Sequence, residues 1–256
     1  MNKMIKILFL AANPSDTSRL RLAMEIRAID QALRQAKFRD KFDIEQHWAV
    51  RVTDLQACLL RHKPDIVHFS GHGSTSSAII LEDNSGNSHP VSVRALSQLF
   101  SVLKDNIRCV VLNACYSERQ ARAIAEHIDC VIGMSTAIGD SAAISFAMAF
   151  YQALGYGRDV KTAFDLGCVQ IDLENLDEQD TPKLIAISAN PQEIVFAPDA
   201  GDSIRPDIPQ GNIPGRTDDA SLRPTPSSEQ SATVIQQHAG DNAVQIGQAR
   251  DIKIQR

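Results

Sequence analysis

Membrane spans, disulfide pairs and targeting signals all lack support in this sequence. No run of eighteen or more apolar residues occurs, so we expect no membrane span. The N-terminal residues lead directly into a predicted strand and lack a signal-peptide pattern. Five cysteines, an odd number with irregular spacing, do not form a disulfide framework. These absences favour a protein of the reducing cytoplasm.

Basic surfaces and phosphate-binding loops are missing as well. The formal net charge is −5 and no basic face is evident, which argues against a nucleic-acid partner. No glycine-rich phosphate loop precedes the first predicted helix, which weakens a nucleotide-binding hypothesis. A metal site built from His68, His72 and Cys115 would have no second ligand cluster to support it. We therefore expect neither a cofactor nor a metal.

Apolar runs alternate with amphipathic segments along most of the chain. This alternation requires parallel strand pairing with helical crossovers and predicts a three-layer α/β sandwich with a mostly parallel central sheet. A hairpin is expected around 83–87, and a small final strand pair at 184–187 and 193–196. The predicted strands cover 6–12, 42–50, 65–71, 109–115 and 129–134, and the predicted helices cover 20–36, 53–61, 93–104, 118–127, 141–154 and 160–176.

The composition changes after Phe196. Residues 198–231 carry six prolines among Asp, Ser and Gly, and they have too few apolar groups to offset the entropy of ordering. We interpret them as a disordered linker that follows a domain at 1–197. Apolar residues then return at 232–256, where Val244 and Ile246 alternate with polar neighbours as in a half-buried strand.

Two of the predicted strands end in groups that carry chemistry. The strand at 65–71 ends in a Gly-His-Gly turn around His72, and the strand at 109–115 ends in Cys115. Ligands of an open parallel sheet bind beyond the carboxyl ends of its strands, so both side chains should lie on that edge. If the two strands are neighbours, their ends lie about 5 Å apart. The pattern predicts a thiol–imidazole hydrolase.

A dyad of this kind needs a reactive thiolate and a site for the oxyanion. A cysteine that opens a helix has its thiolate favoured by the helix N-terminus, and a nearby imidazole lowers the thiol pKa further. The thiolate attacks the carbonyl, while His72 protonates the leaving amine and then activates water. The backbone N–H groups of Gly73 and Cys115 would supply the oxyanion hole.

Other polar residues near the strand ends have two interpretations each. His68 is expected to be a hydrogen-bonded strand histidine, although it could also reach the site. Asn113 is expected to brace the turn. Asp140 either caps the following helix or faces the cleft and selects a basic substrate side chain. The other cysteines sit in apolar runs and are expected in the core: Cys58, Cys109, Cys130 and Cys168.

Several of these motifs, taken in order, resemble one family. The segments 12–14 (Ala-Asn-Pro), 68–73 (His-Phe-Ser-Gly-His-Gly), 112–115 (Leu-Asn-Ala-Cys) and 140–143 (Asp-Ser-Ala-Ala) are similar to the CHAT family of caspase-like cysteine peptidases, which are akin to separase. The resemblance covers residues 5–197. It implies a caspase-type fold, a dyad carried onto His72 and Cys115, a protein substrate and an endopeptidase that waits for a trigger.

The C-terminal segment carries a weaker resemblance. Residues 243–247 (Ala-Val-Gln-Ile-Gly) are similar to the core of RHIM-like amyloid signalling motifs of bacterial immune effectors, and the composition is that of a cross-β segment. Residues 248–250 depart from the pattern, which favours an asparagine soon after the glycine. Under this hypothesis, residues 232–256 recruit an upstream receptor or self-assemble. The alternative is a strand added to the edge of the domain's own sheet.

Two functions of different classes remain at this stage. The first is a cysteine endopeptidase that cleaves a protein partner in a bacterial stress or anti-phage response. The second is a catalytically silent caspase-like adaptor that scaffolds assembly. Labelling of Cys115 by a thiol-directed probe separates them, because only an activated thiol reacts faster than a buried one.

Overall fold

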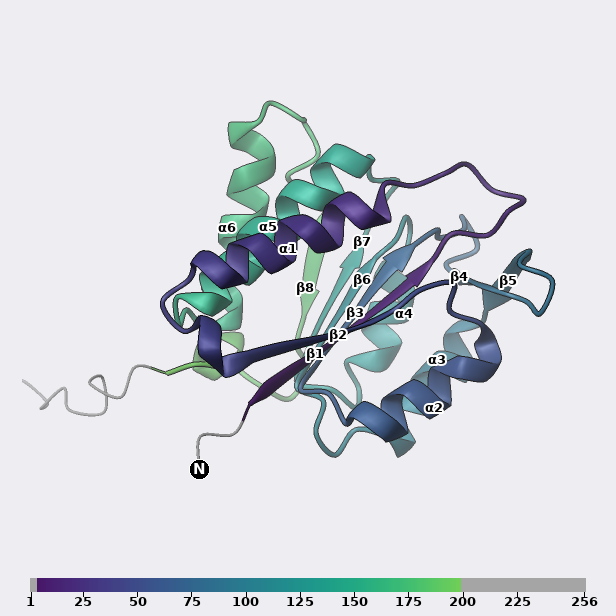
Figure 1. The fold of residues 1–256 in the computed structure, drawn as a ribbon, viewed down its shortest axis with the longest axis horizontal. Coiled ribbons are helices and arrows are strands. Elements are labelled where there is room, and N and C mark those ends of the chain that lie inside the picture. Colours follow the sequence, from purple (N-terminus) through teal and green to yellow (C-terminus); the bar gives the residue numbers. More distant parts are fainter. Residues whose placement is uncertain (1–3, 199–256) are drawn as a thin grey trace, which may run out of the picture. The chain divides into compact units, whose positions relative to one another are not determined.

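A mixed β-sheet forms the centre of the domain. The structure, a computed structural model, describes residues 4–198. Its main sheet has the strand order β2-β1-β3-β6-β7-β8 (Figure 1). The strands from β2 to β7 run parallel, and β8 runs antiparallel to β7. The strands are β1 (Ile5–Ala12), β2 (Phe42–His47), β3 (Ile66–Gly71), β6 (Cys109–Asn113), β7 (Cys130–Met134) and β8 (Pro182–Ile185).

Helices cover both faces of this sheet. In Figure 1, α1, α5 and α6 lie on one side of the strands, and α2, α3 and α4 lie on the other. The three-layer α/β sandwich predicted from the sequence is therefore confirmed. The helices are α1 (Leu22–Gln35), α2 (Val52–His62), α3 (Val93–Val102), α4 (Glu118–Ile124), α5 (Asp140–Gly155) and α6 (Val160–Leu173).

Strand β1 explains why the two layers form. Its side chains alternate between two separate apolar clusters, with Ile7 and Phe9 in the cluster under α1 and α5 and Leu8 and Leu10 in the cluster on the opposite face. A strand buried on both faces has a nearly continuous apolar sequence, as parallel sheets require. Full burial of one such side chain contributes about 1.5–3 kcal/mol.

Helix α5 lies between α1 and α6 and is apolar on almost every side. Small residues bring the helices close together: a Cβ added at Gly167 of α6 would lie 2.6 Å from the Phe146 ring of α5. A helix that is apolar all round is expected to be buried. This packing fixes the N-terminal end of α5, where Asp140 stands.

The predicted hairpin forms a separate two-stranded sheet, β4 (Ile79–Glu82) and β5 (Ser88–Val91). Gln120 of α4 is fully buried and holds the hairpin to the domain, because its Oε1 accepts from the Ile79 N–H (3.0 Å) and its Nε2 donates to the Val91 carbonyl (2.8 Å). The hairpin also pairs with the turn after β3, since the Ile80 N–H donates to the His72 carbonyl. One side chain thus links the His72 turn to the helix that follows Cys115.

The predicted final strand pair is wrong. Strand β8 pairs with β7, whose outer edge is available, and Pro191–Glu193 form a short 3₁₀ helix, η2. Val195 makes an isolated bridge with Asp159 at the start of α6. All but the first residue of the predicted linker 198–231, and the whole segment 232–256, lie outside the described residues, so the domain division, the linker and the RHIM-like motif stay predictions.

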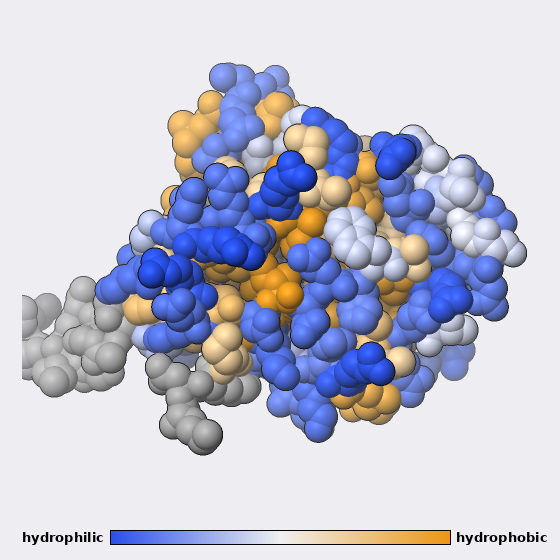
Figure 2. Space-filling view, viewed as in Figure 1, coloured by the Kyte–Doolittle hydropathy of each residue, from blue (hydrophilic) through white to orange (hydrophobic). Residues whose placement is uncertain are grey.

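Charged and polar side chains cover most of the face seen in Figure 2, and apolar side chains are visible mainly in a band between α1 and β2. Three of the exposed apolar side chains of the domain are Met4, Met24 and Trp48. Among the helices of residues 4–198, none combines the length and apolar character needed to cross a bilayer.

Candidate active site

The sheet brings the two predicted catalytic residues to the same edge. Strands β3 and β6 are neighbours, with Ser70 opposite Asn113 in the register. Continuing both strands by two residues places His72 beside Cys115. Both residues line one cavity of about 40 Å³, together with Asp140. The sequence-based expectation that His72 and Cys115 emerge side by side thus agrees with the topology.

The orientation of His72 is set by a loop from the other side of the cavity. Its Nε2 lies 2.7 Å from the backbone carbonyl of Ser18, in the segment between β1 and α1. A carbonyl oxygen only accepts, so this contact places a proton on Nε2. In the neutral ring the other nitrogen, Nδ1, then carries no proton.

Gly73 lies directly against the backbone of Cys115. A Cβ added at Gly73 would stand 1.8 Å from the Cys115 carbonyl oxygen and 3.1 Å from its amide nitrogen. Glycine is required here because any other residue would collide with that backbone. Within residues 4–198, neither the Gly73 N–H nor the Cys115 N–H donates a hydrogen bond. Two adjacent unused donors are what an oxyanion hole needs.

The turn after Cys115 differs from the one predicted. Helix α4 begins at Glu118 with Ser117 as its N-cap, so Cys115 precedes the helix and does not open it. Tyr116 has a positive φ of 55° and donates its N–H to the Thr136 carbonyl (3.0 Å). The donor that faces the thiol is the N–H of Ile138, 3.4 Å from Sγ. This backbone contact takes the place predicted for the helix N-terminus.

Asp140 faces the cavity and is not the helix cap. Gly139 is the N-cap of α5, and Asp140 is the first residue of the helix. Its carboxylate accepts from the backbone N–H (3.2 Å) and the Nε (3.3 Å) of Arg21, while Arg21 also donates to the Ser141 hydroxyl. Of the two roles predicted for Asp140, the structure therefore excludes capping and leaves the cleft-facing one.

A buried carboxylate that was not predicted lies at the same cavity. Glu25 of α1 is only 3% exposed and lines the cavity with the dyad. Its Oε1 lies 2.7 Å from His68 Nε2, and the Ser70 hydroxyl donates a short hydrogen bond to its Oε2. The sequence holds one signal for it, since a glutamate three residues after Leu22 falls on the buried face of the helix.

Asn113 has a different role from the one predicted. Its Nδ2 donates to Glu25 Oε1 (2.7 Å) and to the Ala143 carbonyl (3.1 Å), so it connects the strand end to α1 and α5 and does not brace the turn. Its Oδ1 is buried without a hydrogen-bond partner in the described part of the chain. Asn113 is 4% exposed and also lines the cavity.

His68 is the hydrogen-bonded strand histidine that the sequence predicts. Its second ring nitrogen, Nδ1, lies 3.2 Å from the hydroxyl of the buried Tyr151. Both ring nitrogens are therefore engaged away from Cys115. Among residues 4–198, no group of three or more His, Cys, Asp or Glu side chains is arranged to hold a metal ion.

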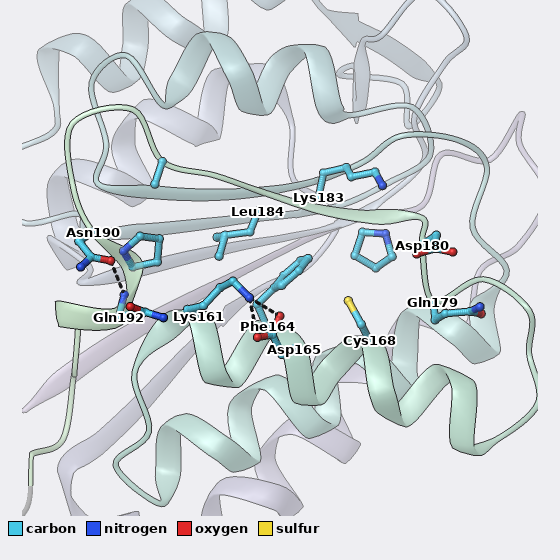
Figure 3. A pocket seen from close by; sticks show the side chains of 13 residues that line it. Lys161, Phe164, Asp165, Cys168, Gln179, Asp180, Lys183, Leu184, Asn190 and Gln192 are labelled. Carbon is cyan, nitrogen blue, oxygen red and sulfur yellow. Dashed lines mark hydrogen bonds and ion pairs between the residues drawn. The ribbon is translucent and has the colours of Figure 1, made fainter.

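A second and larger hollow lies between α6, β8 and η2. It measures about 710 Å³ and is lined by Cys168, Phe164 and Leu184 among others (Figure 3). Figure 3 shows a Lys161–Asp165 ion pair along its wall, with distances of 2.6 and 2.7 Å. Burial raises the pKa of the Cys168 thiol to about 11. Cys168 was predicted in the core, yet it is partly exposed in this hollow, whereas Cys58, Cys109 and Cys130 are buried as expected.

Known proteins similar to this chain include proteases. A probable protease of Gillisia limnaea is 30% identical over 159 residues, which are 60% of this chain and 28% of that protein. A Roc-COR-CHAT protease from an unknown prokaryotic organism is 30% identical over 162 residues, 60% of this chain and 15% of the relative. The chain thus spans less than a third of the curated relatives it matches.

Solved structures share the fold at low sequence identity. A secreted C11 cysteine protease from Bacteroides thetaiotaomicron matches with a TM-score of 0.55 and 11% identity, covering 72% of this chain and 66% of that one. Caspase-1 from Spodoptera frugiperda matches with a TM-score of 0.51 and 13% identity, covering 78% of this chain and 92% of the caspase. The predicted caspase-like fold is confirmed.

The model of the CHAT domain matches residues 8–183, which include the strands, the turns and the cavity described above. The match covers more than half of the sequence. The chain therefore belongs to the CHAT domain family.

Proposed function

We propose that this chain is a cysteine endopeptidase in which Cys115 is the nucleophile and His72 is the general base and acid. The observation that carries the proposal is geometric: His72 and Cys115 end neighbouring parallel strands and line the same cavity. The protease names of the relatives support the same reaction class.

The first half of the reaction uses the tautomer that Ser18 favours. The Ser18 carbonyl holds the proton on His72 Nε2, so Nδ1 accepts the proton of the Cys115 thiol. The sulfur attacks the carbonyl carbon of a peptide bond, and the carbonyl oxygen takes the negative charge. The imidazolium then gives its proton to the leaving amine, which departs and leaves a thioester on Cys115.

The second half returns the enzyme to its starting state. His72 accepts a proton from water, the hydroxide attacks the thioester carbonyl, and the thiolate leaves with the proton returned from the imidazolium. In both halves the oxyanion forms beside the N–H groups of Gly73 and Cys115. Two such donors, aimed at the developing charge, are worth about 10²–10³-fold each in rate in enzymes of this type.

The substrate is a protein, and Asp140 is a candidate to contact it. Its carboxylate lines the cavity and is 28% exposed on the side chain, and it is paired with Arg21. A basic side chain of a substrate would make the same ion pair. Asp140 would then select for a positively charged residue next to the cleaved bond.

The biological setting follows from the C-terminal segment of the sequence. We propose an effector of a bacterial stress or anti-phage signalling system, recruited through residues 232–256. Recruitment through the predicted linker would gather several protease domains at high effective concentration. The proposal rests on the sequence of that segment alone.

The test compares the full chain with its Cys115→Ala variant in lysate of the source cells. New protein termini should appear with the parent chain and be lost, to below detection, with the variant. Cys168→Ala is the matched control and should leave cleavage unchanged. Equal cleavage by the parent and Cys115→Ala would contradict the proposal and favour the adaptor.

A further inference from the structure

The cavity beside the dyad has an unusual imbalance of hydrogen-bonding groups. Its polar lining apart from His72 consists of Glu25, Ser70, Asn113, Asp140 and Cys115. The Ser70 hydroxyl is used on Glu25, and the Asn113 amide N–H₂ group is used on Glu25 and Ala143. The oxygen atoms of Glu25, Asn113 and Asp140 are acceptors among these lining residues.

The orientation of Asn113 is fixed by its partners. Its Nδ2 lies between two oxygen atoms that only accept, the Glu25 carboxylate and the Ala143 carbonyl. Oδ1 is thereby left without a donor among residues 4–198, in a residue that is only 4% exposed. An unsatisfied buried acceptor costs about 1–3 kcal/mol. A ligand that donates to Oδ1 would recover this energy.

Glu25 is a buried carboxyl group contacted by the side chains of His68, Ser70 and Asn113. His68 Nε2 lies 2.7 Å from Glu25 Oε1, and His68 Nδ1 lies 3.2 Å from the Tyr151 hydroxyl, so both ring nitrogens are engaged. Burial raises the pKa of Tyr151 well above its ordinary value, which keeps that phenol protonated. Among residues 4–198, the one ion-pair contact of Glu25 is with His68, at 2.7 Å, and none is with a lysine or arginine.

Apolar side chains make up the rest of the cavity lining, and they suit the aliphatic part of a long basic side chain. Leu20, Leu22, Ile138 and Ala143 line it beside the acceptors. The present volume of about 40 Å³ has room for about three water molecules, which is too little for an arginine side chain. Arg21, which pairs with Asp140, is half-exposed and is the side chain that a substrate cation would displace.

We infer that Glu25 and Asn113 form the floor of a specificity pocket for an arginine side chain of the substrate, with Asp140 at its rim. This inference rests on the proposed function, because it assumes that Cys115 attacks the bond next to that arginine. A planar guanidinium presents five N–H donors, which match the Glu25 carboxylate, the free Asn113 oxygen and the Asp140 carboxylate. Glu25 is here a specificity-determining residue and takes no part in the bond chemistry.

The experiment measures covalent labelling of the full chain by peptidyl acyloxymethyl ketones, in which the Cys115 thiolate displaces the carboxylate leaving group. Two probes differ in one residue, which is arginine in the first and citrulline, its uncharged isostere, in the second. Intact-mass spectrometry gives the labelling rates. The arginine probe should react at least about tenfold faster, since hydrogen bonds to charged groups are about twice as strong as neutral ones.

Variants then assign the preference to Glu25. In Glu25→Gln the arginine-to-citrulline ratio should fall to near one. Asp30→Asn, an exposed carboxylate of the same helix, is the matched control and should keep the parent ratio. Should Glu25→Gln fail to fold, the comparison of the two probes on the parent chain still decides the inference.

Three outcomes count against the inference in distinguishable ways. Equal rates for the two probes on the parent chain overturn the arginine pocket alone, and the proposed peptidase stands. A full arginine preference in folded Glu25→Gln removes Glu25 from the pocket. If iodoacetamide alkylates Cys115 but neither peptidyl probe does, the proposed function fails and the pocket fails with it.

Discussion

Two hollows of this domain each contain a cysteine, and they differ in almost every other respect. The hollow with Cys168 is the larger, at about 710 Å³ against 40 Å³, yet its charged pair, Lys161 and Asp165, is already mutually satisfied. The hollow with Cys115 is small, but it is lined or bordered by an imidazole and by two backbone N–H groups and an amide oxygen that have no hydrogen-bond partner among residues 4–198. Size therefore does not indicate chemistry here, whereas convergent polar groups do.

The local environment of the two thiols explains the difference. Burial against α6 and β8, with the carboxylates of Asp165 and Asp180 nearby, disfavours the thiolate of Cys168. Cys115 instead follows its strand at the open edge of the sheet, where the N–H of Ile138 faces the sulfur. The structure thus disfavours the thiolate of Cys168, whereas Cys115 is the thiol to which we assign the proposed reaction.

The largest expected effect concerns the reactivity of Cys168. With a pKa of about 11, it has about one ten-thousandth of its thiols ionised at pH 7, so iodoacetamide should alkylate it roughly 300-fold more slowly than an ordinary cysteine of pKa 8.5. Because the pKa is raised, the thiolate fraction grows about tenfold per pH unit up to pH 11. Peptide mapping after timed alkylation of Cys115→Ala from pH 7 to 10 measures this slope.

A plateau of the Cys168 rate below pH 9 would break the comparison, because both hollows would then contain an ionisable thiol. The unfolded chain is the control. In denaturant, Cys168 should react at the rate of an ordinary cysteine, since the burial that raises its pKa is gone.

The next effect tests the close contact between Gly73 and the backbone of Cys115. Gly73→Ala places a methyl group 1.8 Å from the Cys115 carbonyl oxygen, and the nearest atoms that it meets all belong to the Cys115 backbone. The turn must shift, so at least one oxyanion donor moves. We expect labelling of Cys115 by a peptidyl probe to fall about 10²-fold. The thermal midpoint should also drop, because backbone strain of this kind costs about 1–3 kcal/mol.

Gly139→Ala is the matched control for this substitution. The added methyl group would meet only the end of the flexible Glu178 side chain, at 3.0 Å. Its labelling rate should stay within about twofold of the parent rate, as for surface changes that strain nothing. If Gly73→Ala labelled as fast as Gly139→Ala, the two N–H groups would have no part in the reaction.

The sequence predicted the strand ends that carry His72 and Cys115 better than it predicted the other residues that line the cavity. His72 and Cys115 were predictable because each ends an apolar strand, and parallel strands bring their carboxyl ends to one edge. Glu25 was not, since it comes from a helix whose rotation against the sheet is set by packing with α5. The amide of Asn113 was assigned to a turn for the same reason: its partners on α1 and α5 are distant in sequence.

The sequence pattern also did not predict the N-cap of α5 or the pairing of β8, the last strand of the sheet. Asp140 fits a helix cap by residue type, but the chain enters α5 one residue earlier, at Gly139, which frees the carboxylate for Arg21. Strand β8 was predicted to pair with residues 193–196, whereas β7 offers a longer antiparallel partner. Both errors arise where tertiary contacts override local preference.

The smallest expected effect concerns Arg21, whose guanidinium pairs with Asp140 at the small hollow. The pair with Asp140 joins side chains that are 47% and 28% exposed, so solvent screens it, and its removal should change stability by no more than about 0.5–1 kcal/mol. Arg21→Ala removes the guanidinium from the Asp140 carboxylate and keeps the backbone N–H contact, and labelling of Cys115 by an arginine probe should rise about two- to fivefold. Arg34→Ala, which breaks an exposed ion pair on the same helix, should leave the rate unchanged. A slower reaction of Arg21→Ala would mean that Arg21 positions Asp140 for the substrate instead of competing with it. The difference between the hollow of Cys115 and the hollow of Cys168 would then no longer depend on the Arg21–Asp140 pair.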